Sequence, residues 1–240
     1  MRKTIAAAVI AASAAATSCA QNRSEDAGPV VTRSFPVGNF TEVEVAGPFD
    51  VDIRTGANPG VSARGEQKLI DRLEVEVRGS KLLVRPRREN RWFGGGGTHG
   101  SGHISVTVPM IRSATLAGAG DISIDNVRGE DFQGQIAGSG DLKVGSVEVG
   151  SLKLGIAGSG AASARGRAQR AEYEIAGSGG VDAQNVATEE LKVSIAGSGN
   201  IKAHATRAAD VDIMGSGDVD VTGGAKCKVS KAGSGHVRCG

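Results

Sequence analysis

Polar and apolar residues alternate with a period of two over most of the second half of the chain. Residues 141–144 read DLKV, residues 191–195 read LKVSI, and residues 218–221 read DVDV. Successive side chains of a β-strand point to opposite faces, so this pattern predicts strands with one face buried and one in water. The lysine and aspartate positions mark the solvated face. No helical spacing of three and four residues competes within these segments.

A glycine-rich motif recurs between the alternating segments. It reads AGAG at residue 117, AGSG at residues 137, 157, 176 and 196, MGSG at 214 and AGSG at 232, in steps of 20, 20, 19, 20, 18 and 18 residues. Two short strands and a few bends per repeat describe the coil of a solenoid, in which each coil pairs with its neighbours about 4.8 Å away. We therefore predict an all-β fold, a parallel β-helix (β-solenoid) with coils of about 20 residues.

Stacking in register predicts columns of equivalent side chains. One apolar column precedes the corner motif and comprises Leu116, Ile136, Ile156, Ile175, Ile195 and Ile213. It ends in Lys231, as expected of a terminal coil that faces water. Burial of such columns stabilises the stack by about 25 cal/mol per Å² of apolar surface, and no coil can bury its face alone.

The repeated glycines are expected to form structural corners. A sharp corner between closely approaching backbones favours glycine, which tolerates positive φ and has no side chain. The predicted corner glycines are Gly118, Gly120, Gly138, Gly140, Gly158, Gly160, Gly177, Gly179, Gly197, Gly199, Gly215, Gly217, Gly233 and Gly235.

The first half of the chain follows the same pattern less regularly. Residues 43–53, VEVAGPFDVDI, form a degenerate copy of strand, corner and strand. Residues 73–77 and 82–84 add strands around a Gly79–Ser80 turn. We predict one domain over residues 30–240, with irregular coils over 30–115 and regular coils over 116–240.

The N-terminal segment has the features of an export signal. Residues 1–20 have a basic start, an alanine-rich apolar middle and small residues near Cys19, and are too short to favour a membrane span. Two cleavages compete: a lipobox-like Ala16–Cys19 would make Cys19 a lipidated first residue, whereas Ser18–Ala20 suits an ordinary signal peptidase. Residues 21–29 then form a polar tether. We expect an exported protein, held in the periplasm or at the outer membrane as a lipoprotein, or else soluble in the periplasm.

Composition narrows the class of partner. The formal net charge is +2, and two cations, Arg2 and Lys3, lie in the signal segment, so the exported chain is near neutral and nucleic-acid binding is not indicated.

Export makes Cys227 and Cys239 disulfide candidates. Their spacing places both in inward columns of the last coil, where a disulfide, a reactive pair or two buried thiols are the alternatives. The spacing of Cys and His gives no support to a zinc site.

Several of these features occur together in one known family. The order GPFDVDI at residues 47–53, a strand pair, SVTVP at 105–109 and then reiterated GSGD resembles the putative autotransporter adhesin, head GIN domain family. The resemblance covers nearly all of the chain after the signal. It implies a right-handed parallel β-helix, an exported location and a role in adhesion, and it transfers no catalytic residues.

The residue that follows each corner is a candidate site. The column reads Asp121, Asp141, Ala161, Gly180, Asn200, Asp218, His236. Calcium-binding repeats have a period near nine residues and an acid in each turn, so Ala161 and Gly180 argue against calcium. The corner also matches no phosphate-binding fingerprint. We expect no cofactor and no metal, and interpret the aspartates as turn residues.

Enzymatic solenoids use outward acids on neighbouring coils, and five aspartates are available here for such a role: Asp182, Asp210, Asp212, Asp218 and Asp220. Lysines interleave with them, as alternating solvated strands would produce in any case. We predict no catalytic residues, and the alternative is a polysaccharide lyase or hydrolase of the envelope.

The segment 85–103 breaks the repeat most strongly. It contains arginines, the single tryptophan and two histidines, and loops of this kind often carry binding residues. The candidate binding residues are Arg87, Arg88, Arg91, Trp92, Phe93 and His99, with a metal at His99 and His103 as a lesser alternative. The sequence thus predicts a non-catalytic, adhesin-like envelope protein that binds an unidentified protein or glycan. An accessory role in envelope stress signalling is a further alternative.

Overall fold

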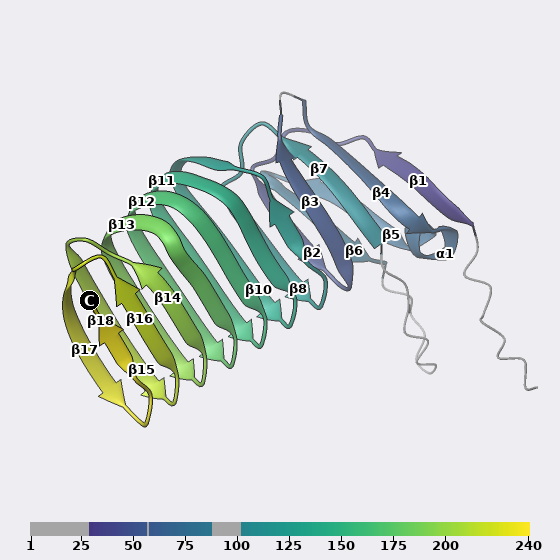
Figure 1. Ribbon diagram of the computed structural model, residues 1–240. Helices are drawn as coiled ribbons and strands as arrows, with labels where there is room; N and C mark the ends of the chain where they lie inside the picture. Colours follow the sequence, from purple (N-terminus) through teal and green to yellow (C-terminus); the bar gives the residue numbers. More distant parts are fainter. Residues whose placement is uncertain (1–28, 57, 88–101) are drawn as a thin grey trace, which may run out of the picture.

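The computed structural model describes residues 29–56, 58–87 and 102–240 and shows a rod of stacked coils (Figure 1). The rod is a β-solenoid of about six turns, which confirms the predicted fold class. The N-terminal elements are β1 (Val30–Phe35), β2 (Glu42–Ala46), β3 (Phe49–Thr55), β4 (Gly60–Glu66), α1 (Gln67–Asp71), β5 (Leu73–Arg78), β6 (Lys81–Pro86), β7 (Gly102–Val108), β8 (Ser113–Gly118) and β9 (Ile122–Ile124). The remaining strands are β10 (Val127–Gly138), β11 (Asp141–Gly158), β12 (Ala161–Gly177), β13 (Gly180–Gly197), β14 (Asn200–His204), β15 (Ala208–Gly215), β16 (Asp218–Thr222), β17 (Lys226–Ala232) and β18 (Val237–Cys239).

Each regular coil has two walls. The first wall follows a glycine corner, the second wall leads into the next corner, and the bend that joins them lies on the opposite edge of the rod. We call this edge the rim and define it as residues 145–151, 165–170, 184–190 and 205–207. In β11, β12 and β13 one long strand covers both walls and the bend, whereas β14 and β15 divide the following coil between them (Figure 1).

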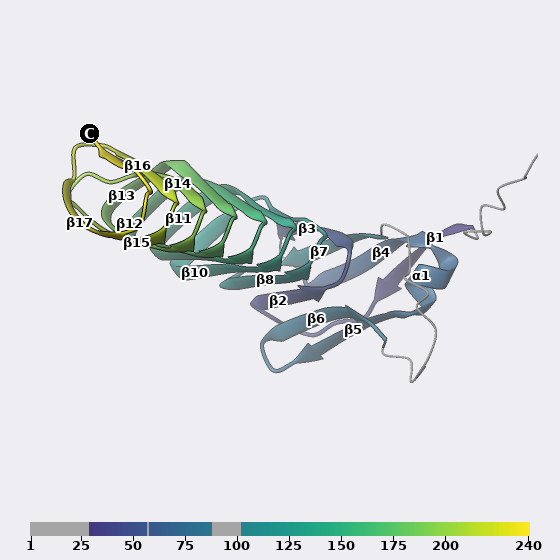
Figure 2. The ribbon, with the colours of Figure 1, turned by 90° about the horizontal axis from the view of Figure 1, so that it is seen from below.

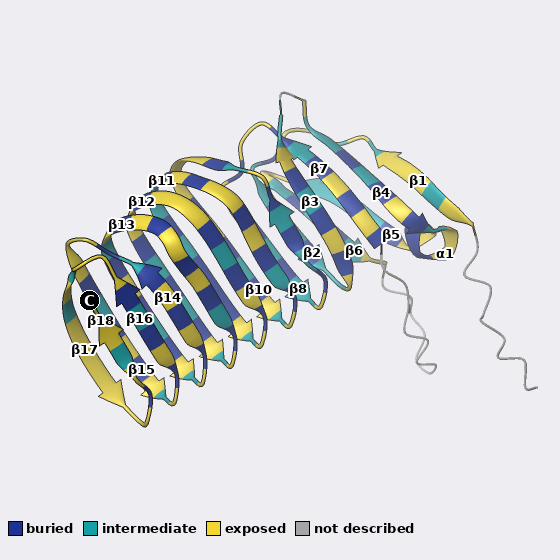
Figure 3. Cartoon of the chain, viewed as in Figure 1, coloured by how far each residue is buried: buried dark blue, intermediate teal, exposed yellow. Residues whose placement is uncertain are grey.

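The coils stack in the register that the repeat predicts. Ile136 lies opposite Leu116 on one side and Ile156 on the other, and the column continues to Ile213 and Lys231. It also extends into the N-terminal half, because Leu116 lies opposite Val45, which in turn lies opposite Val84. The inward positions form a continuous buried core, visible as dark bands alternating with exposed residues along the strands (Figure 3).

The two glycines of each corner are required for different reasons. Gly197 has φ of +132°, and a Cβ there would lie 2.2 Å from the carbonyl oxygen of Gly177 in the preceding coil. Gly199 has no positive φ, yet a Cβ there would lie 2.6 Å from the Ile175 side chain. The first glycine is therefore fixed by backbone conformation and close contact, and the second by close contact alone.

The N-terminal part differs from the expected series of irregular coils. The parallel copy of strand, corner and strand is present, since β2 pairs with β8 and β3 pairs with β9. Beyond it, however, β4 pairs antiparallel with both β7 and β1, and β5 pairs antiparallel with β6. Figure 2 shows the resulting two layers diverging, with α1 at their far end. Leu69 and Ile70 of this short helix, which the sequence pattern did not predict, are buried and contribute to the core.

The last coil is closed by covalent and polar contacts. Cys227 and Cys239 form a disulfide between β17 and β18, so the predicted pairing is confirmed. The Lys231 ammonium donates a 2.7 Å hydrogen bond to the carbonyl oxygen of Gly235. The apolar column thus ends in a side chain that satisfies a backbone acceptor at the open end.

The side chain of Thr188, at the bend of β13, is polar and buried. Its Oγ1 is buried and has no hydrogen-bond partner among the described residues. A buried hydroxyl without a partner is costly, so Thr188→Val is expected to raise the free energy of unfolding by about 1 kcal/mol in chemical denaturation. A loss of similar size would show instead that the hydroxyl is hydrogen-bonded.

Candidate functional site

The second wall carries a ladder of alternating charges. Lys153, Glu172, Lys192, Asp210 and Lys228 occupy one register column on successive coils. Lys153 Nζ lies 3.3 Å from Glu172 Oε2, and Lys192 Nζ lies 3.0 Å from Glu172 Oε1. Each charge is therefore matched to the coil before or after it, and the column reinforces the stacking of the core.

The ion pairs also shift the pKa values of the charged side chains on this wall. Hydrogen bonds from Lys192 and then Lys153 hold the pKa of Glu172 below its ordinary value of 4.5, against desolvation, which raises it. Hydrogen bonding to Glu174 raises the pKa of Lys153, and hydrogen bonding to Glu172 raises the pKa of Lys192.

The lowered pKa of Glu172 predicts a loss of stability in acid. Because the folded-state pKa lies below the unfolded value, the stabilisation is complete above pH 4.5 and is lost as the pH falls through the folded pKa. Glu172→Gln should reduce this loss and cost less than about 1 kcal/mol at neutral pH, since the pair is partly exposed. Denaturant melts between neutral and acid pH measure the effect, with the exposed Glu130→Gln as the control. An unchanged acid profile in Glu172→Gln would contradict it.

The aspartates after the corners have a structural role. Asp121 Oδ1 accepts a 2.9 Å hydrogen bond from the backbone N–H of Asp141, and Asp141 Oδ1 accepts one of 3.1 Å from Ala161. Asp218 Oδ1 likewise accepts the backbone N–H of His236, which lowers the pKa of Asp218. Each carboxylate thus bonds to the coil that follows it. Within the described ranges, no group of three His, Cys, Asp or Glu side chains is arranged to hold a metal ion.

The five outward aspartates do not converge on a common site. Asp210 lies 4.0 Å from Lys228 on the second wall, and Asp220 lies 3.8 Å from Arg238 on the first. Asp182 lies opposite Lys202 in register, and Asp212 lies between Ser194 and Ser230. They are spread over two walls, most of them opposite a cation.

The candidate loop falls largely outside the described residues. Arg88, Arg91, Trp92, Phe93 and His99 all lie in the range 88–101, as does any metal site that would need His99, and Cys19 lies before residue 29. Arg87 follows β6, and its backbone N–H donates to Arg72 O at 2.7 Å. The expected loop is shorter than 85–103, because Arg85 belongs to β6 and His103 belongs to β7, where it lies 3.2 Å from Asp52.

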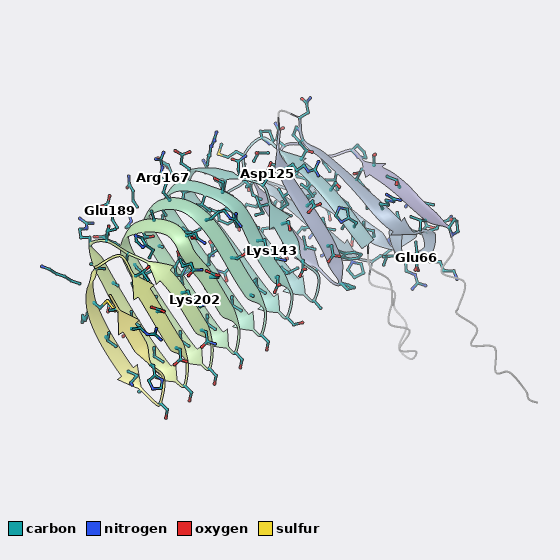
Figure 4. All side chains as sticks on the ribbon, in the orientation of Figure 1. Glu66, Asp125, Lys143, Arg167, Glu189 and Lys202 are labelled. Carbon is teal, nitrogen blue, oxygen red and sulfur yellow. A yellow bond between two sulfur atoms is a disulfide. The ribbon has the colours of Figure 1, made fainter. Side chains whose placement is uncertain are left out.

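The rim carries a depression that the sequence analysis did not identify. It has a volume of about 510 Å³, within the range of about 300–1,000 Å³ typical of ligand pockets. We call it the rim groove. Its exposed lining residues are Glu148, Arg167, Gln169, Ala187, Glu189 and Thr206, and its floor includes Val149, Ala168 and Thr188. Figure 4 shows Arg167 and Glu189 at this edge, away from Lys143 and Lys202 on the first wall.

A one-residue difference in coil length explains the position of the groove. Val144 lies opposite Ala164 but Val147 opposite Gly166, so β12 uses one residue fewer than β11 at the bend. The same deletion appears against β13, where Ser163 lies opposite Asp182 and Arg165 opposite Asn185. A shorter bend reaches less far outward, and Gly166 permits it: its φ is +130°, and a Cβ there would lie 2.1 Å from Val147 O.

Two carboxylates flank the groove, which bears on the enzyme alternative. Glu148 and Glu189 lie two coils apart, and they are also offset by two residues along the strand because Ala187 stands in the register column of Glu148. Glu148 is salt-bridged to Arg128 and Arg167, and Glu189 lies 3.9 Å from Arg207. Glycoside hydrolysis needs one carboxyl in its protonated form, whereas both of these are paired with arginine.

The fold and surface together define a class of protein: a β-solenoid whose polar residues are arranged in ladders between coils. The chain belongs to the family described as putative auto-transporter adhesin, head GIN domain, whose model matches residues 39–225. The family suggested by the corner and strand motifs is thereby confirmed. Within the described ranges no helix is long and apolar enough to cross a membrane.

Solved structures share this fold at low sequence identity. A putative adhesin from Bacteroides fragilis NCTC 9343 is 20% identical with a TM-score of 0.78, and 88% of this chain and 97% of that chain are covered. A putative lipid binding protein from Parabacteroides distasonis ATCC 8503 is 23% identical with a TM-score of 0.69, and the coverage is again 88% and 97%. No protein with a curated description matches the sequence. At these identities the likeness shows the fold alone.

Proposed function

We propose that this protein is a non-catalytic, adhesin-like binding protein of the cell envelope. The observation that carries the proposal is the pairing of charges between coils. Lys153, Glu172 and Lys192 illustrate it on the second wall, and Asp220 with Arg238 on the first. Carboxylates that are engaged in holding coils together are poorly suited to proton transfer, whereas a rod whose charges are paired between coils suits the display of a binding surface.

The family and its structural neighbours support the same proposal. The family description and the Bacteroides fragilis structure both name an adhesin, and the export signal of residues 1–20 would bring the chain to the envelope. Acylation of Cys19 would then anchor the rod through the tether of residues 21–29. Metabolic labelling with a fatty acid tests this part, since Cys19→Ser should abolish the label and release the protein from the membrane fraction.

Binding and catalysis are separated by one experiment. The chain is mixed with sheared cell-envelope fragments and sedimented, and the supernatant is examined for new reducing ends or unsaturated sugars by mass spectrometry. The proposal predicts co-sedimentation that saturates with protein and no released sugar. Release of oligosaccharides that is lost in Glu148→Gln would support the enzyme alternative, and no sedimentation above that of heat-denatured chain would contradict the binding function.

A further inference from the structure

We propose that the rim groove binds an uncharged glycan chain that lies across the coils of β11, β12 and β13. The inference rests on the proposed binding function and adds to it a site and a ligand class. In the described ranges, the groove lies where the alternation of acidic and basic residues from coil to coil along the rim is interrupted.

The break is seen by following one register column along the rim. Glu148, Arg167 and Ala187 occupy this column on successive coils, and Arg128 of β10 precedes them in the same register. The alternation of charge would require an acid after Arg167, and an alanine stands there instead. On the second wall, by contrast, Lys192 has Glu172 on one side and Asp210 on the other.

Arg167 is therefore paired on one side only. Its guanidinium contacts Glu148 of the preceding coil, and its side chain is 72% exposed. Arginine has five N–H donors in a planar fork, so a single carboxylate leaves donors available. Arg167 and Ala187 both line the groove, so these donors are available to a ligand that lies in it.

The remaining lining supplies both donors and acceptors. Gln169 is exposed and carries an amide that can donate and accept, and Gly150, its neighbour in the preceding coil, adds no side chain over it. Thr206 donates its hydroxyl to Thr188 O at 3.2 Å, which leaves its oxygen free to accept. Glu189 adds a carboxylate acceptor that is 61% exposed.

This mixture favours a ligand of hydroxyl groups over a charged one. Sugar hydroxyls donate and accept at once, so they can satisfy guanidinium, amide, hydroxyl and carboxylate together. An anionic chain would be attracted by Arg167 but repelled by Glu148 and Glu189. A cationic chain would be attracted by the two glutamates but repelled by Arg167. The methyl group of Ala187 offers a small apolar surface for the C–H face of a sugar ring, whereas that of Ala168 belongs to the buried core.

The groove is open to solvent, so binding is expected to be weak. No aromatic ring lines it among the described residues, and we expect a Kd of about 1 mM for a short oligosaccharide. Many copies of the chain on a surface would strengthen the attachment by multivalency.

The test titrates the isotope-labelled chain with neutral hexasaccharides and records amide NMR shifts. The probes are xylohexaose, maltohexaose, laminarihexaose and mannohexaose, each up to about 10 mM, with hexagalacturonate as the charged comparison. At least one neutral probe should shift the amides of Gly150, Ala168 and Ala187. Arg167→Ala should weaken that binding about tenfold or more, because a charge-assisted hydrogen bond is lost.

Ala187→Glu is the sharper variant because it completes the interrupted ladder. It should occupy the groove, pair with Arg167 and abolish glycan binding while the melting temperature stays the same or rises. Lys143→Ala, an exposed cation on the first wall, is the matched control and should bind as the unaltered chain does.

Three results would overturn the site. The first is no amide shift with any neutral probe, and the second is tighter binding of hexagalacturonate than of every neutral probe. The third is that Lys143→Ala weakens glycan binding as much as Arg167→Ala does. If Ala187→Glu still co-sediments with envelope fragments as the unaltered chain does, the groove is wrong and the binding function stands. If neither chain sediments, the binding function itself is wrong.

Discussion

Replacing Gly197 by valine is expected to lower the free energy of unfolding by about 3–5 kcal/mol, among the largest effects of a single substitution. Two costs act together. The backbone there has φ of +132°, which a β-branched residue does not readily adopt, and a Cβ would lie 2.2 Å from Gly177 O in the preceding coil. Either the corner must open or two coils must separate, and both break the register of the neighbouring strands.

Gly180→Val is the matched control on the same coil. Gly180 has no positive φ, and the nearest atom to its Cβ position is Asn200 O at 3.7 Å, an ordinary contact. Valine also favours strands, so this variant should unfold within about 0.5 kcal/mol of the unaltered chain. Thermal and denaturant melts compare the two, and equal melting of Gly197→Val and Gly180→Val would show that the corners do not hold the stack.

Removal of the disulfide should destabilise the end of the rod by about 2–3 kcal/mol, the effect expected for closing a short loop. Cys227 and Cys239 are separated by 12 residues and join the two walls of the last coil. Because solenoid coils contact only their neighbours, the loss should be concentrated in β17 and β18.

Hydrogen exchange of the Cys227→Ser/Cys239→Ser variant measures this local effect. Amides of β17 and β18 should exchange faster, while those of β11 and β12 should be protected as before. Uniformly faster exchange along the rod would show that the disulfide stabilises the whole stack cooperatively, and unchanged exchange would show that the last coil does not depend on it.

The repeated part of the fold could be predicted from sequence because local pattern and long-range register coincide there. The period-two alternation specifies which side chains point inward, and the step between corners specifies which residues lie opposite each other. These two patterns predict that Ile136 lies opposite Ile156 and that Cys227 lies in the column of Ala209, as the structure shows.

The N-terminal cap could not be predicted in the same way. Period-two alternation is identical for parallel and antiparallel strands, so the sequence of β4 does not reveal that it pairs antiparallel with β7 and β1. The helix α1 is only one turn long, and its Leu69 and Ile70 provide too short a pattern to distinguish it from a strand.

The rim groove corresponds to a small irregularity in the sequence that can be interpreted only when the register of the strands is known. One step between corners is 19 residues where its neighbours are 20, and this is the coil that is shorter at Gly166. Ala187 likewise appears unremarkable until the register places it after Glu148 and Arg167. The aspartates that the sequence made conspicuous act instead as backbone acceptors between coils.

The central claim is that this rod binds at the envelope without chemical turnover, and one measurement tests it most directly. The chain is incubated with isolated envelope polysaccharide, and bound protein and polysaccharide length are determined in the same sample over time. We predict saturable binding with an unchanged length distribution. Progressive shortening of the polysaccharide, or binding no greater than that of the heat-denatured chain, would contradict the claim.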